Sequence, residues 1–428
     1  MSHPQHVLPA VSSGDMVTPG WRQFDSWVAV VAALGIGSRL PLFGPLTLTL
    51  VIPLVLLPVW VSQVGRYRKS VMVFAGFGAI LNGLILNALN APTHQVSVAL
   101  TQAQVVLILE LLLGAGTLAW VRSVLGSGRM AFLFGAGLLL DVLSRLSADN
   151  PWKFSLALPV TVCVLALGWI LRAPWVELLA LLALALVSAL NDSRSAASIL
   201  AVAFLILAWQ RLRTALKLRS TALRVLTNVV VLGLVGYFMM QAFILDGWLG
   251  EGAQVRSEAQ IRSSGSLLLG GRPEIGATLA LLRASPGGYG MGVTPNFADI
   301  YVAKSGMERL NYDPNNGYVE RYMFGNGFEV HSGIGDLWLR CGLLGLTFML
   351  AMLWLVLRNS AVRLAEGRGR ALTTFLTIQV AWDACFSPFY TTAQLALMLA
   401  VALLVPAPRP SSRARRVLVP EKPLTIRA

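Results

Sequence analysis

The sequence predicts an all-α integral membrane protein with about twelve transmembrane helices and one large loop on the outer side of the membrane. The first observation is composition: 56% of the 428 residues are hydrophobic and only 13% are charged, whereas a soluble domain carries about 25% charged residues. The second is a series of apolar runs of about 20 residues, the length that crosses a bilayer. The third is the alternation of basic and uncharged loops. Together these observations exclude a soluble fold.

Twelve apolar segments reach or approach the length of a membrane span. They cover residues 27–42, 44–63, 70–90, 98–121, 129–146, 154–171, 175–191, 195–210, 223–245, 337–357, 371–387 and 389–405. Prolines separate the members of the first pair and of the last pair. The segments divide the chain into a tail at 1–26, a helical block at 27–246, a loop at 247–336, a second helical block at 337–405 and a basic tail at 406–428.

The basic residues predict the orientation of these segments. They concentrate in four short loops, at 66–69, 122–129, 211–219 and 358–370, and in the tail from residue 406. Lys and Arg in short loops are retained in the cytoplasm, and all four loops fall on one side of a twelve-helix arrangement. We therefore expect both termini to be cytoplasmic, with the first helix as an uncleaved anchor. The net charge of +14 is dispersed over these loops, which argues against a nucleic-acid partner.

The segment 247–336 then lies on the outer side. It contains seven Lys or Arg and nine Asp or Glu, so its formal charge is −2, unlike the rest of the chain. A structureless loop of this length is uncommon unless it is functional or disordered. Aromatic and aliphatic residues occur throughout it, so we expect it to contain short helices and to fold against the bundle.

Polar residues on the outer side are few. Between the seventh and eighth segments the chain reads LNDSRSAAS, which places Asp192 and Arg194 at the membrane boundary. An Arg at a helix end commonly extends to the lipid headgroups. Because small residues follow Arg194, the alternative is a guanidinium that emerges from a tightly packed helix pair.

A second candidate, Arg272, lies in the outer segment. The stretch that follows it predicts a short amphipathic helix, with Ile275, Leu279 and Leu282 on one face. An arginine and free backbone N–H groups at a helix N-terminus form a site for a phosphate-type anion. The alternative is that Arg272 only caps a surface helix.

His331 stands at the end of the outer segment, in EVHSGIGDLWLRCGLLGL. A histidine offers a base that titrates near neutral pH, although a lone histidine is also a common structural residue. No second histidine or pair of carboxylates accompanies it at the spacing of metal ligands. We therefore expect neither a metal site nor a cofactor.

These residues resemble the bacterial O-antigen ligase family. The stretch from His331 fits H-[NSQ]-x9-G-x-x-[GTY] through Ser332, Gly342 and Gly345. GGRPEI resembles the family's Arg-containing helix, the flexible glycine run SPGGYGMG its glycine turn, and NDSRSA its Ser-Arg-small motif. These motifs occur in the family's order, and the resemblance covers roughly 185–355.

The resemblance implies a GT-C-like glycosyltransferase of the bacterial cytoplasmic membrane. Its donor is a glycan on polyprenyl (undecaprenyl) diphosphate, and its acceptor is a hydroxyl of lipid A-core or of a similar glycolipid or glycan. Arg194 and Arg272 would bind the diphosphate, a task suited to the planar guanidinium. His331 would take the proton from the acceptor hydroxyl, with inversion and without metal or nucleotide.

Further residues are candidates for substrate binding. Arg256 and Arg262 could extend the diphosphate patch, and Asp192 and Ser332 could contact the donor or its glycan. The chain departs from the family at Gly276, where relatives often carry a bulky aromatic side chain, and has Ser332 where many have Asn.

Other functions fit the sequence less well. A polymerase of O-antigen, capsule or exopolysaccharide belongs to the same superfamily and shares the motifs. A flippase or transporter would carry charged residues deep in several helices. Those in the predicted spans are too few and too scattered to line a path: Glu110, Asp141, Glu177, Arg340 and Asp383. A structural membrane scaffold is the remaining class.

Overall fold

The computed structural model describes residues 19–64, 70–143, 145–146, 149–218, 220–247, 251–264, 270–325 and 327–406. Helices make up nearly all the regular structure of these residues, and their strands form the short hairpin of β1 (Pro41–Phe43) and β2 (Leu46–Thr47). Five helical stretches are long and apolar enough to cross a membrane: Met72–Asn90, Val98–Leu125, Trp152–Ile170, Arg194–Ala215 and Gly333–Ala365. The all-α prediction is confirmed, and the apolar helices are those of a membrane protein.

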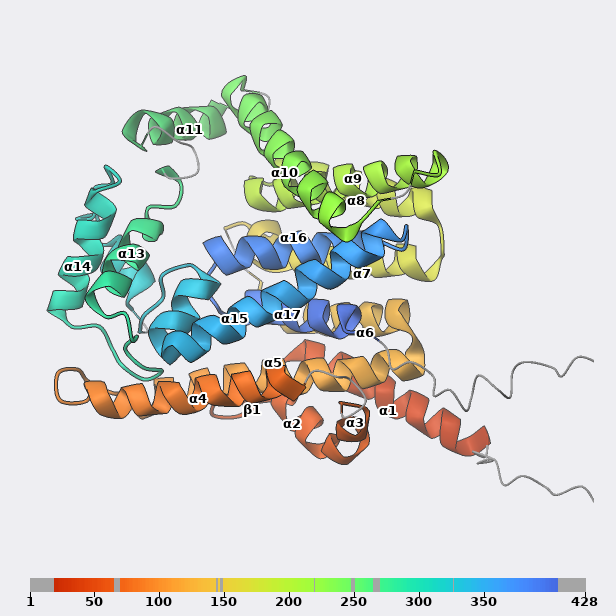
Figure 1. Ribbon diagram of the computed structural model, residues 1–428, viewed down its shortest axis with the longest axis horizontal. Coiled ribbons are helices and arrows are strands. Elements are labelled where there is room, and N and C mark those ends of the chain that lie inside the picture. Colours follow the sequence, from red (N-terminus) through yellow and green to blue (C-terminus); the bar gives the residue numbers. More distant parts are fainter. Residues whose placement is uncertain are drawn as a thin grey trace, which may run out of the picture.

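The helices lie side by side along the long axis of the molecule, and the elements between α10 and α15 gather at one end (Figure 1). Up to that point the elements are α1 (Pro19–Ser38), α2 (Leu48–Val55), α3 (Leu57–Val64), α4 (Ser70–Asn90), α5 (Val98–Leu125), α6 (Ser127–Leu143), the π-helical turn η1 (Trp152–Leu156), α7 (Ala157–Ile170), α8 (Pro174–Leu190), α9 (Arg194–Ala215) and α10 (Ala222–Leu245). The rest are α11 (Glu251–Ser264), α13 (Glu274–Ala284), α14 (Phe297–Glu308), η2 (Val319–Met323), α15 (Gly333–Ala365), α16 (Ala371–Phe386) and α17 (Thr391–Leu404).

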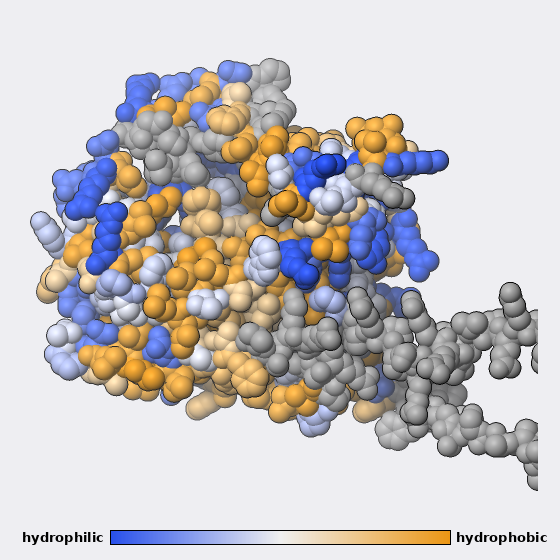
Figure 2. All heavy atoms as spheres, viewed as in Figure 1, coloured by the Kyte–Doolittle hydropathy of each residue, from blue (hydrophilic) through white to orange (hydrophobic). Residues whose placement is uncertain are grey.

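The surface of the bundle carries large apolar side chains. Trp354 and Leu343 of α15 are 62% and 58% exposed, and α10 exposes Leu234 and Phe238. On the face shown in Figure 2, hydrophobic residues cover much of the middle and hydrophilic ones gather toward the ends. Exposed apolar area of this extent marks a surface that contacts lipid or protein.

The predicted span 44–63 is wrong as a single helix. Gly44 adopts φ +54° at the tip of the β1–β2 hairpin, and Pro53 lies inside α2, which ends before Leu56. Proline lacks the N–H that continues a helix. Its carbonyl instead accepts a hydrogen bond from Trp60 Nε1 at 2.8 Å, which fixes α3 against α2.

The predicted tails lie mostly outside the described residues. Of the tail 1–26, the structure describes the residues from Pro19, where α1 already begins. Of the tail 406–428, it describes residue 406 alone.

The two glycines of the outer-loop pattern shape α15. Gly342 has φ +61° and ψ −154°, which interrupts the helix, and Asn82 Nδ2 of α4 donates to the Cys341 carbonyl at 2.8 Å. A Cβ on Gly345 would lie 2.1 Å from the Leu337 carbonyl oxygen. Only glycine fits both positions, so these parts of the pattern have a structural explanation.

The glycine run 285–292 is held firmly, whereas the sequence predicted a flexible stretch. Asn90 Nδ2 of α4 donates to the Tyr289 carbonyl at 2.7 Å, and the Gly292 N–H donates to Asn87 Oδ1 at 2.9 Å. Tyr289 is 4% exposed. The run therefore fastens the outer segment to the turn between α4 and α5.

The short helix after Arg272 exists, as α13, but its predicted apolar face is wrong. Leu279 is 51% exposed, whereas Ala277 and Leu281 are fully buried. The cause is a close helix crossing, because a Cβ on Gly276 would lie 2.2 Å from the Gly306 carbonyl oxygen of α14. The absence of a side chain at Gly276 thus permits α13 and α14 to touch.

Candidate functional site

A cavity of about 760 Å³ lies at the end of the bundle that carries the outer segment. Its walls come from α6, α7, α9, α16 and α17, and Arg272 and His331 line it from the loops. Phe375, Trp382 and Leu395 contribute an apolar side. The volume is in the range of sites that enclose a drug-sized ligand. The structure therefore places two of the three predicted catalytic residues in one cavity.

His331 is held by the chain on both sides of it. The carboxylate of Asp336 accepts a hydrogen bond from the Val330 N–H at 2.7 Å. Ser332 Oγ donates to the Ala384 carbonyl at 3.1 Å and accepts from the Gly335 N–H at 3.2 Å. His331 itself adopts φ +53°, an unfavourable conformation for a non-glycine residue that occurs where surrounding structure enforces it.

The imidazole of His331 stacks on Tyr318, with ring centroids 6.1 Å apart. Its Nδ1 is buried and has no hydrogen-bond partner among the described residues. A buried ring nitrogen without a partner is unusual. The imidazole therefore has an unused hydrogen-bonding position at Nδ1, which the surrounding atoms cover.

Tyr318 links His331 to the helix that follows Arg272. Its hydroxyl donates to Glu274 Oε1. Burial, and then the neighbouring Glu274 carboxylate, raise the pKa of Tyr318, so the phenol stays protonated as a donor. Our predictions did not include Tyr318, which directly precedes η2.

Arg272 is half-buried, and its guanidinium carbon lies 5.8 Å from the ring centroid of Trp382 on α16. Such cation–π contacts orient a guanidinium without using its N–H donors. The donors of Arg272 remain available to an anion in the cavity, beside the face that carries His331.

Arg194 is placed differently. It begins α9, and the flanking residues Ser193 and Ser195 line the cavity. Its NH1 donates to Ser257 Oγ of α11 at 2.9 Å, and its Nε lies 3.9 Å from Asp192 Oδ1. The motif thus borders the cavity, while the guanidinium joins α9 to the outer segment.

The remaining predicted binding residues lie in different places relative to the cavity. Ser332 caps α15 beside His331. Arg262 on α11 has a side chain that is 79% exposed and pairs with Glu258 at 3.0 Å, so the structure does not bring it to the cavity lining. The side chain of Arg256 lies outside the described residues.

Three cations in the cavity lining were not predicted as site residues. They are Arg39 at the end of α1, Arg145 after α6 and Lys153 in η1. A signal was available, because these residues occur in loops for which the sequence predicts the outer side, where basic residues are depleted.

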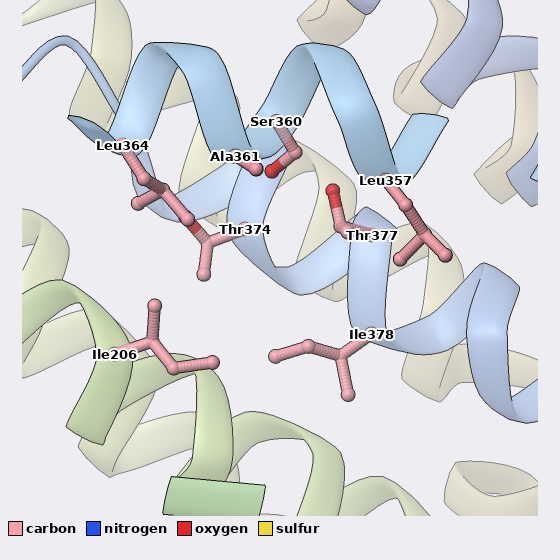
Figure 3. Close-up of a pocket in the computed structure, with 8 residues that line it drawn as sticks. All are labelled: Ile206, Leu357, Ser360, Ala361, Leu364, Thr374, Thr377 and Ile378. Carbon is pink, nitrogen blue, oxygen red and sulfur yellow. The ribbon is translucent and has the colours of Figure 1, made fainter. Parts of the chain in front are cut away.

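A second cavity, between α9, α15 and α16, is too small for a substrate. It measures about 20 Å³, enough for about one water molecule. Figure 3 shows the hydroxyls of Ser360 and Thr377 near one another at its edge. It is a packing gap in the membrane-type part of the bundle.

The described residues contain no group of three or more His, Cys, Asp or Glu side chains that could hold a metal ion. Comparison with protein-family models, with curated proteins and with solved structures finds no match. The fold and the site therefore define the class: an all-α protein with membrane-type helices and a basic cavity beside its outer segment.

Proposed function

We propose that the protein is a glycosyltransferase of the O-antigen ligase and polymerase type, with about twelve spans and a GT-C-like architecture. It transfers a glycan from a polyprenyl diphosphate to a hydroxyl on the outer side of the bacterial cytoplasmic membrane. The observation that carries the proposal is the shared cavity of Arg272 and His331. A cationic anchor, a base and an apolar wall are what a lipid-linked diphosphate donor requires.

The reaction is a single displacement at the anomeric carbon. The acceptor hydroxyl oxygen forms the new bond, its proton passes to His331, and the bond to the diphosphate oxygen breaks. The leaving polyprenyl diphosphate takes the electron pair, and Arg272 stabilises its growing negative charge. The donor is already activated, so the step consumes no nucleotide.

Arg194 remains the second proposed ligand of the diphosphate. Its hydrogen bond to the neutral Ser257 hydroxyl is of a kind that a phosphate oxygen can replace, since an Arg–phosphate pair is charged on both sides and is frequently bidentate. The flanking Ser193 and Ser195 already line the cavity. In this arrangement donor binding would loosen the contact between α9 and α11.

A ligase and a polymerase differ only in the acceptor that reaches the cavity. For a ligase the acceptor is lipid A-core, and for a polymerase it is a second lipid-linked glycan. We favour the ligase. A transporter is not favoured, because it requires a path through the bundle instead of a cavity at one end.

The direct test is transfer by purified protein in lipid nanodiscs. With an undecaprenyl diphosphate glycan and lipid A-core, we expect turnover in EDTA and without ATP, because positioned arginines replace the metal as electrophile. Product formation is measured by mass spectrometry, and heat-denatured protein is the control. Full loss of turnover in EDTA, restored by Mg²⁺, would show that the arginines do not have this role.

The orientation has its own test, in a variant whose three native cysteines are replaced by alanine. Phe297→Cys on α14 is at a site that is 92% exposed, and Leu218→Cys follows α9 at a site that is 57% exposed. A membrane-impermeant maleimide should label Phe297→Cys in intact cells and Leu218→Cys only after lysis. The reverse pattern would place the cavity in the cytoplasm and refute the proposed function.

A further inference from the structure

The cavity holds more positive charge than one donor needs. Its lining contains Arg39, Arg145, Lys153 and Arg272 but a single carboxylate, Asp141. A diphosphate with a lipid on one side and a sugar on the other carries one negative charge on each phosphate. If Arg272 and Arg194 bind that donor, three cations remain on another wall.

These three cations come from neighbouring elements. The ends of α1 and α6 pack together, and η1 contacts both α6 and α7. Arg272 and His331, by contrast, lie next to α16, through Trp382 and the Ala384 carbonyl. The cavity therefore has two basic walls, one beside the proposed base and one formed by α1, α6 and η1.

On the second wall the side chains of Arg145 and Lys153 are exposed, whereas that of Arg39 is partly buried. Arg39 has a buried Nε without a hydrogen-bond partner among the described residues, and such a donor is costly to leave unpaired. Its backbone has φ +47°, so the turn before β1 fixes its direction. Arg145 pairs with Asp141, and Lys153 Nζ lies 3.9 Å from Asp192. Both keep exposed side chains.

The position of these cations is also unexpected on topological grounds. Basic residues in short loops are depleted on the outer side of the membrane, yet Arg39, Arg145 and Lys153 lie at the same end of the bundle as the outer segment. Arg and Lys both bind phosphate groups, Arg through its planar fork and Lys as a point charge.

We infer that Arg39, Arg145 and Lys153 form a second phosphate subsite, which binds a phosphate-bearing acceptor while the donor occupies the wall with Arg272. The inference rests on the proposed function. It names the acceptor class as an anionic glycolipid, and the phosphate can belong to lipid A-core or to the diphosphate of a second lipid carrier. Two substrates with phosphates on separate walls would meet between them, where His331 lines the cavity.

The test uses the full-length protein in nanodiscs and the variants Arg145→Gln and Lys153→Gln, whose exposed sites tolerate substitution. Arg129→Gln, at the opposite end of α6 and also exposed, is the matched control. Three acceptors are compared: lipid A-core, the same glycolipid after phosphatase treatment, and a second undecaprenyl diphosphate glycan. Equilibrium binding of each is measured without donor, and KM and kcat are measured with it.

For the phosphorylated acceptor we expect Kd and KM to rise about tenfold in each variant, the loss of roughly one charged hydrogen bond. The donor KM, kcat and the constants of phosphatase-treated lipid A-core should stay unchanged. The acceptor that shows the effect identifies the source of the phosphate. Equal constants for all three acceptors, or a rise in the donor KM instead, would overturn the subsite. Phosphate-dependent binding without any transfer would support the subsite and refute the proposed glycosyltransferase.

Discussion

His331→Asn should lower kcat by about 10² to 10⁴ fold, the usual effect of removing a general base, while donor binding stays near normal. Asparagine is the suitable replacement because it tolerates the left-handed conformation better than alanine does, and His331 has φ +53°. His331→Ala adds a backbone cost to the chemical loss. Comparing the two variants thus separates the effect of losing the imidazole from the effect of straining the loop backbone.

The matched comparison is Arg272→Lys. Lysine keeps the charge but loses the planar fork, so this variant should weaken donor binding, whereas His331→Asn should not. Donor Kd, turnover and thermal stability are measured for both in nanodiscs. Near-normal turnover by well-folded His331→Asn would refute its role as base and leave charge stabilisation by Arg272 as the main source of catalysis.

The second large effect concerns Asp336, which is fully buried. Its carboxylate accepts hydrogen bonds from the Val330 and Phe389 N–H groups, both at 2.7 Å, and lies 3.8 Å from Arg340 NH2. Asp336→Asn would remove the carboxylate that is paired with Arg340. Breaking a buried ion pair in this way costs about 3–5 kcal/mol, and the amide, with one acceptor oxygen, can keep only one of the two backbone hydrogen bonds.

We therefore expect Asp336→Asn to unfold at a clearly lower temperature and to lose activity. Asp313→Asn, at an exposed position of the outer segment, should change stability by less than about 0.5 kcal/mol. Adding Arg340→Met removes the second charge, so the double variant should recover part of the lost stability. If Asp336→Asn had the same melting temperature as the unaltered protein, the pair of Asp336 and Arg340 would not be what holds the loop in place.

The long helices could be predicted from the sequence because each apolar run is a local signal that burial in lipid requires. The predictions that were wrong concern segments whose conformation is decided by a distant part of the chain. The glycine run 285–292 is rigid because Asn87 and Asn90 bind it. The face of α13 is set by Gly306 of α14. Neither partner can be found from local periodicity.

The distinction between local signals and distant contacts also applies to the residues of the site. The positions of Arg272 and His331 followed from short motifs, and the structure places both in one cavity. Tyr318 could not be found, since its role depends on packing against His331 and on a hydrogen bond to Glu274, 44 residues away, and no local pattern reveals either contact. The three cations Arg39, Arg145 and Lys153 were visible as exceptions to the charge bias of the loops, but only the packing of α1, α6 and η1 brings them to one wall.

The attachment of the outer segment to the turn between α4 and α5 limits how this protein can be recombined. The glycine run takes its shape from two asparagines of α4, about two hundred residues earlier in the chain. A chimera that exchanges 247–336 with another protein would separate these partners and leave buried backbone groups unpaired. The outer segment can therefore be transplanted only if the end of α4 moves together with it.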